Sequence, residues 1–208
     1  MGSSILQHHP FSSLNFCRKL RCWDIRLLQR RKSAPKPKPI VMTFNDPTCL
    51  HGSRRPRGIK SLCKGSGPTA GILFGFSADS RVHAYSLQSL TGYDSNYTHP
   101  SMQVNSFYVG LSASPCGRWL ACGGPDGNSF LFDVHDAGNH GVTPSRGVQL
   151  GVHQKTKGEI GSVSWNSEGL ATSSDEGVVR VWRPDIDVYR RCQADPETEQ
   201  WHWDWSNQ

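Results

Sequence analysis

Apolar and polar residues alternate in a stretch near the end of the chain. Such alternation, with a period of two, is typical of β-strands with one buried face. The polar segment Asp175-Glu176-Gly177 interrupts it and ends in glycine, as a tight hairpin turn requires. We therefore predict three short strands joined by tight turns, over residues 159–165, 170–174 and 178–182.

The same order of features occurs twice earlier in the chain. One copy has runs at 107–113, 119–124 and 129–132, and a weaker copy has runs at 59–62, 72–76 and 82–85. Each copy closes on an aromatic residue (Tyr85, Phe132 and Trp182), at intervals of 47 and 50 residues. Internal repeats of this size are typical of propellers and related arrays. The extra length falls in residues 91–105 and 137–158, which are rich in Gly, Asn and Ser and which we expect to be loops.

The repeat resembles the WD40 repeat, most clearly in Leu170-Ala171-Thr172-Ser173-Ser174-Asp175 and Val179-Arg180-Val181-Trp182. This resemblance implies an all-β fold, a partial WD40 β-propeller with about three four-stranded antiparallel blades. It also implies a structural role for the turn aspartates, because in that family they brace the blade by hydrogen bonds. Asp175 is the clearest of these, and Asp79 and Asp126 match more loosely.

The segment Cys22-Trp23-Asp24-Ile25-Arg26 looks like the last strand of a preceding blade. Propellers generally close with four to eight blades, so we expect the chain to be a piece of a propeller, roughly its C-terminal half. The predicted division is an irregular leader (1–21), the last strand of an incomplete blade (22–26), a basic Pro-rich loop (27–57), three WD40-like blades (58–185) and a polar tail containing Trp residues (186–208).

The formal net charge is +6, and the dense basic stretches lie within residues 18–60. Two of them, 28–39 and 53–57, suit either nuclear import or contact with nucleic acid, or are simply solvated loops. The tail contains Trp201, Trp203 and Trp205, whose spacing puts them on one face of a strand. Such a face would either form a contact site or cover an open blade edge.

The sequence contains no recognisable catalytic motif, which favours a binding protein over an enzyme. The seven cysteines are scattered without a C-x-x-C pair, so we expect neither a metal site nor a cofactor. No apolar run approaches the roughly 20 residues of a membrane span, and we expect no membrane partner.

Trp23-Asp24-Ile25-Arg26 has the form W-D-x-R at the end of a blade. It is followed in order by the basic loops, the Leu73–Asp79 run, Ser106-Phe107-Tyr108-Val109 and the 170–183 blade. This succession resembles the C-terminal half of the propeller in the denticleless family, over about residues 22–185. The family consists of substrate receptors of cullin-4-type RING ubiquitin ligases.

The resemblance implies a non-catalytic, nuclear receptor that directs ubiquitin-dependent degradation of replication and cell-cycle proteins. Its implied partners are the damaged-DNA-binding adaptor of the ligase, substrates with a clamp-interaction degron and the sliding clamp, with nucleic acid involved only indirectly. By carry-over, Trp23, Asp24 and Arg26 would bind the adaptor. A planar guanidinium with five donors suits such an interface. Two other functions remain open, a general WD40 scaffold for other proteins and, less favoured, a basic nucleic-acid-binding module.

Overall fold

The computed structural model describes residues 20–24, 38–42, 58–103, 109–138, 145–150, 158–167 and 169–182. Several predicted features lie outside these ranges. They are Arg26, nearly all of the two basic stretches, the Ser106–Tyr108 part of the denticleless-like run, and the tail from residue 183, with its three Trp residues.

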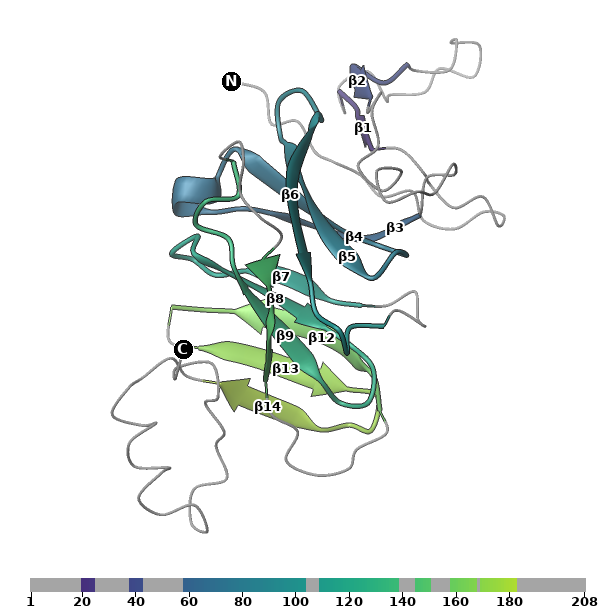
Figure 1. Ribbon diagram of the computed structural model, residues 1–208, viewed down its shortest axis with the longest axis vertical. Coiled ribbons are helices and arrows are strands. Elements are labelled where there is room, and N and C mark those ends of the chain that lie inside the picture. Colours follow the sequence, from purple (N-terminus) through teal and green to yellow (C-terminus); the bar gives the residue numbers. More distant parts are fainter. Residues whose placement is uncertain are drawn as a thin grey trace.

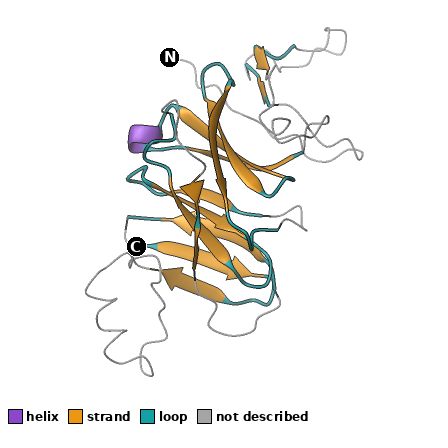
Figure 2. Ribbon diagram, viewed as in Figure 1, coloured by secondary structure: helices purple, strands orange, loops and turns teal. Residues whose placement is uncertain are grey.

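The described residues form β-strands and one short 3-10 helix (Figure 2). The strands are β1 (Arg21–Cys22), β2 (Val41–Met42), β3 (Ile59–Lys64), β4 (Ile72–Ser77), β5 (Arg81–Ser86), β6 (Gly92–Thr98), β7 (Leu111–Ala113), β8 (Trp119–Gly123), β9 (Ser129–Asp133), β10 (Ser145–Arg146), β11 (Val148–Leu150), β12 (Ile160–Trp165), β13 (Leu170–Ser174) and β14 (Val179–Trp182); the helix, η3, is Gly67–Thr69. The predicted all-β class is confirmed.

Three sheets follow one another along the chain and stack face to face (Figure 1). The first has the order β10-β6-β5-β4-β3, the second β11-β9-β8-β7 and the third β12-β13-β14, and a separate pair joins β1 to β2. The strands of each sheet are antiparallel except β10, which runs parallel to β6. Consecutive antiparallel meanders stacked in this way are blades of a partial β-propeller.

The expectation that residues 91–105 and 137–158 are loops is wrong in part. β6 occupies 92–98, and β10 and β11 lie within 145–150. These strands complete the first two blades, yet they carry little of the apolar alternation that reveals the others. β6 contains Asp94, Ser95 and Asn96 between its two tyrosines. Part of what holds these strands is backbone pairing with the neighbouring strand, which composition alone does not disclose.

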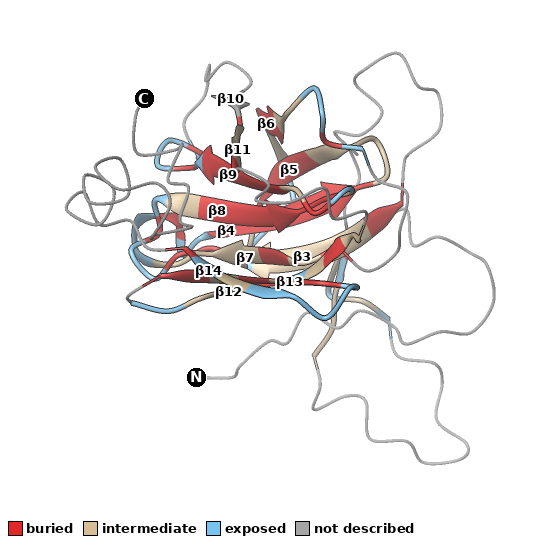
Figure 3. Ribbon diagram, turned by 90° about the horizontal axis from the view of Figure 1, so that it is seen from below, coloured by how far each residue is buried: buried red, intermediate tan, exposed pale blue. Residues whose placement is uncertain are grey.

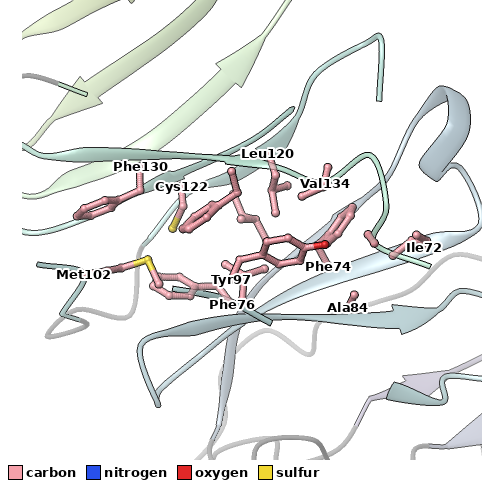
Figure 4. Close-up of a cluster of buried hydrophobic side chains, with 14 of the residues drawn as sticks. Ile72, Phe74, Phe76, Ala84, Tyr97, Met102, Leu120, Cys122, Phe130 and Val134 are labelled. Carbon is pink, nitrogen blue, oxygen red and sulfur yellow. The ribbon is translucent and has the colours of Figure 1, made fainter. Parts of the chain in front are cut away.

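The largest core lies between the first and second sheets (Figure 4). Phe74 and Phe76 of β4 face Phe130 and Phe132 of β9, and all four are fully buried. Tyr97 of β6 lies among them, in edge or tilted contact with two of the rings. Burial of this order contributes about 1.5–3 kcal/mol for each large apolar side chain. This packing therefore holds the first and second sheets together.

The strand registers repeat from blade to blade. Leu73 pairs with Tyr85, Leu120 with Phe132, and Leu170 with Trp182. Each of these pairs faces the preceding element: the first pair packs with Leu20 of the β1 region, the second with the first sheet, and the third with the second sheet. In each blade, therefore, one face of the sheet packs against the preceding element of the stack, and the other face is directed toward the following one.

No helix in the described part of the chain is long and apolar enough to cross a membrane.

Candidate functional site

The predicted adaptor contact begins in β1, at one end of the stack (Figure 1). Cys22 pairs with Val41 and Arg21 with Met42, and the amide of Ile40 donates to the carbonyl of Cys22 at 2.8 Å. Trp23 and Asp24 follow directly, and both are half-buried. Part of each side chain is therefore open to a partner. Arg26, the third predicted contact, lies outside the described residues.

Leu20 anchors this segment on the first sheet. It is buried against Leu73, Tyr85 and Leu90, and Cys22 and Val41 pack on the same cluster. The two-residue strand β1 could not hold its position through backbone pairing alone, because isolated two-stranded ribbons are marginal in water. The apolar contact therefore fixes where Trp23 and Asp24 lie.

A second blade end lacks the W-D-x-R motif, with Phe and His in place of Trp and Arg, but it has an aspartate at the corresponding position. Phe132-Asp133-Val134-His135 ends the third strand of the second sheet. The Asp133 carboxylate accepts hydrogen bonds from the His135 amide at 3.0 Å and from Arg118 Nε at 3.0 Å. This carboxylate thus braces the turn within its own blade.

The Asp79 carboxylate lies in the turn between β4 and β5. One oxygen lies 2.8 Å from His83 Nε2, and the other accepts the Arg81 amide at 3.2 Å. His83 is buried on β5, and Arg81 donates to the Asn96 side chain on β6 at 3.0 Å. These bonds link the turn to two neighbouring strands.

Asp126 and Asp175 occupy the corresponding turns of the second and third sheets, and both are exposed. Asp126 has a positive φ of 55°, a conformation that aspartate tolerates better than most residues. The amide of Asp175 donates to the Glu159 carbonyl at 3.0 Å. A bracing role for the carboxylates of Asp126 and Asp175 stays a prediction.

Two tryptophans form structural contacts that the sequence did not reveal. Trp165 of β12 donates its indole N–H to the Ser112 carbonyl of β7 at 3.1 Å, which joins the third sheet to the second. Trp182 donates to Thr172 Oγ1 at 3.1 Å inside the third sheet. A buried indole generally finds such a partner, but which partner depends on the stacking of the sheets.

Lys60 of the first sheet and Glu159, just before β12 of the third, interact electrostatically. Burial lowers the pKa of the Lys60 ammonium, and the negative charge of Glu159 partly offsets this effect. Residues from non-adjacent sheets therefore influence each other, as they do where innermost strands converge around a propeller axis.

Two free cysteines differ in chemistry. Burial raises the pKa of the Cys122 thiol well above its ordinary value. For exposed Cys116, burial would raise the pKa slightly, but hydrogen bonds from Ser114 and nearby backbone amides outweigh it, so the pKa lies below its ordinary value. Within the described ranges, no three His, Cys, Asp or Glu side chains gather in a way that could hold a metal ion.

The blade order and the repeated strand registers define the class of the protein as a WD40-type β-propeller. No family model matches the chain. It is 33% identical over 171 residues to cell division cycle protein cdt2 of Schizosaccharomyces pombe, an alignment that covers 80% of this chain and 32% of that protein.

It is also 29% identical over 184 residues to denticleless protein homolog A of Xenopus laevis, covering 86% of this chain and 23% of the relative. For the denticleless protein homolog of Gallus gallus the identity is 27% over 168 residues, with coverages of 79% and 21%. These similarities, at 27–33% identity over about 80% of the chain, support the assignment to the denticleless family. The chain spans about a third or less of the length of these relatives.

Proposed function

We propose that this chain is the C-terminal propeller part of a substrate receptor of a cullin-4-type RING ubiquitin ligase. The observation that carries the proposal is its 33% identity to cdt2 across 80% of the chain. In this role the propeller binds and orients other proteins, and the ubiquitin-transfer chemistry belongs to the associated RING and E2 proteins. The protein would act in the nucleus, on replication and cell-cycle substrates that carry a clamp-interaction degron.

The proposed docking element for the adaptor is Trp23, Asp24 and Arg26. Its position supports this role, because Trp23 and Asp24 are half-buried on an anchored two-strand ribbon. The corresponding Asp133 suggests how the roles divide: Asp24 would hold the turn while Trp23 and Arg26 contact the adaptor. The guanidinium of Arg26 can bind a carboxylate or several carbonyls with its fixed fork of donors.

The test is co-purification of the adaptor with the full-length protein that contains this chain. Arg26→Ala should reduce the recovered adaptor at least about tenfold, since a truncated charged contact at an interface costs about 2 kcal/mol or more. Arg26→Lys should rescue it only partly, because the fork geometry is lost. Arg21→Ala is the matched control, since Arg21 is an exposed arginine of the same ribbon.

Undiminished binding by Arg26→Ala would remove that residue from the docking element. A pull-down that returns other proteins, and neither cullin nor adaptor, would favour instead a general WD40 scaffold. The two results are separable, because the first concerns one residue and the second the identity of the complex.

A further inference from the structure

One short segment of the chain, residues 145–150, joins the rims of the first and second blades, and we call it the rim segment. Its first part, β10, pairs in parallel with β6 of the first sheet, with Ser145 opposite Tyr97. Its second part, β11, pairs antiparallel with β9 of the second sheet, with Leu150 opposite Ser129. Figure 3 shows β10 beside β6 and β11 beside β9. The segment therefore passes from one blade to the other within the single residue between β10 and β11.

Gly147 is the residue at which the rim segment crosses between the blades. It is buried, and its amide donates to the Thr98 carbonyl of β6 at 2.9 Å. A Cβ at this position would overlap the ring of Phe132, which is fully buried in the core between the two sheets. Glycine therefore lets the backbone pass close to this core and still bond to β6.

Other contacts fix the rim segment on the second blade. Leu150 is fully buried in the apolar cluster between the second and third sheets. Gln149 Nε2 donates to Asn128 Oδ1, in the turn before β9, at 2.8 Å. The pairing with the first blade is shorter, because β10 has two residues, and parallel pairing is slightly less stable per residue than antiparallel pairing. The second blade therefore positions the segment, and β10 reaches from it to β6.

The strand that receives β10 is incompletely held by its own sheet. The pairing of β6 with β5 is irregular between His83 and Tyr85, and residues 94–96 in the middle of β6 are polar. The second blade supplies bonds on the other side. Besides the bond from Gly147, Ser95 Oγ donates to the carbonyl of Ala137, in the connection that follows β9, at 3.2 Å. The order of β6 therefore depends on contacts from the neighbouring blade.

We propose that β6 and residues 145–147 form one unit that opens and closes together, while β4, β5, β8 and β9 stay folded. Proteins open locally in cooperative units, at free energies below that of global unfolding. Opening of this unit uncovers the outer edge of β5 and the ring of Tyr97, which in the closed form contacts Phe74 and Phe132. The rim segment of the second blade thereby controls access to a strand edge of the first.

Native-state hydrogen exchange of the full chain at increasing urea concentrations tests the proposal. The Gly147 amide and the amides by which β6 bonds to β5 should give the same free energy of opening and the same dependence on urea. The amides of Phe74 and Leu120, on the central strands β4 and β8, should exchange at least about tenfold more slowly. Separate opening of Gly147 and β6, or opening of β6 only together with β4 and β8, would overturn the proposal.

The substitution Gly147→Ala tests the crossing itself. The added methyl group overlaps Phe132 and should push the backbone away from Thr98, so the β6 amides should exchange at least about tenfold faster. Gly138→Ala is the matched control on the same connection between β9 and β10, because its Cβ would lie 3.5 Å from Ile72 Cδ1, an ordinary contact. Unchanged exchange of the β6 amides in Gly147→Ala would contradict the proposal.

A second variant keeps the test decisive if Gly147→Ala disturbs the core around Phe132. Ser95→Ala removes the bond from β6 to Ala137 without touching the rim segment. If the two parts open as one unit, the exchange of the Gly147 amide and of the β6 amides should speed up by the same factor, about threefold to tenfold. Faster exchange of β6 with no change at Gly147 would show that the two open independently.

Discussion

Individual side chains in this protein act mostly by tying one strand to the next. Asp79 shows this best, because its carboxylate joins a turn to His83 on β5 and to the amide of Arg81. The resemblance to WD40 repeats predicted a bracing role for Asp79. The sequence did not reveal that His83 would be its hydrogen-bond partner. His83 is one of nine histidines, and only the pairing of β4 with β5 brings it 2.8 Å from the carboxylate.

Replacement of Asp79 by alanine should destabilise the protein by about 1–3 kcal/mol, because the buried ring of His83 loses its partner. The measurement is the midpoint of urea unfolding. Asp94→Ala is the control, since Asp94 is an exposed carboxylate on β6, and it should change the unfolding free energy by less than about 0.5 kcal/mol. Equal effects of the two substitutions would show that the Asp79 bonds contribute nothing of their own.

At the scale of elements, the connections of adjacent blades interlock. η3 in the first blade packs against the Ser114–Gly117 turn of the second, where Ser66 Oγ donates to the Ser114 carbonyl and Thr69 Oγ1 to the Gly117 carbonyl. A Cβ on Gly117 would overlap the Ser66 carbonyl oxygen. The turn-forming residues were predicted, but this contact between two turns was not.

Substitutions at two glycines with nearly the same backbone conformation can distinguish the cost of backbone strain from the cost of steric overlap. Gly117 and Gly177 have φ of +74° and +78°, but a Cβ on Gly177 would meet nothing within 4 Å. Gly177→Ala should therefore cost only the left-handed backbone strain, about 1–2 kcal/mol. Gly117→Ala should cost at least about 2 kcal/mol more. Comparison of the two unfolding free energies measures the contact between η3 and the turn, and equal losses would argue against its tight packing.

At the scale of the whole molecule, the three sheets lie in sequence order and turn their innermost strands toward one another. β7 contacts both β3 and β12, and the charge interaction between Lys60 and Glu159 extends from the first sheet to the third. This arrangement creates two ends. The β1–β2 pair packs against the first, and the valines of β14 are exposed on the second.

The interaction between the first and third sheets predicts a pH effect. Burial lowers the pKa of Lys60 and Glu159 opposes that change, so Glu159→Gln should lower the pKa of Lys60 further. A lysine pKa that is lower in the folded state destabilises the fold below that pKa. The free energy of unfolding should therefore rise as the pH increases from the pKa of Lys60 in the folded state toward the ordinary lysine value. This rise should be larger in the variant than in the parent.

Titration of Lys60 followed by NMR of its side chain checks this expectation. Lys64→Ala in the same strand serves as a control for general charge effects, since Lys64 is exposed. An unchanged Lys60 pKa in Glu159→Gln would mean that the two sheets do not influence each other at this point.

The sequence by itself determined the strands whose side chains alternate, the turns between them and the family. Alternation and turn chemistry are local, so the runs at 72–76, 119–124 and 170–174 could be read directly as β4, β8 and β13. The resemblance to the denticleless family also rested on the order of motifs along the chain. The Trp23–Arg26 docking site was inferred in the same way, and both the site and its adaptor-binding role remain predictions.

Only the tertiary structure decided which faces are covered. Ala121 and Leu131 of the second sheet are fully buried because the third sheet packs on them, whereas at the corresponding register of the third sheet Val181 is exposed. Ala121 and Ala171 are the same residue type at the same repeat position. Burial depends on what packs against a face, which in a stack of sheets is set by residues some 50 positions away along the chain.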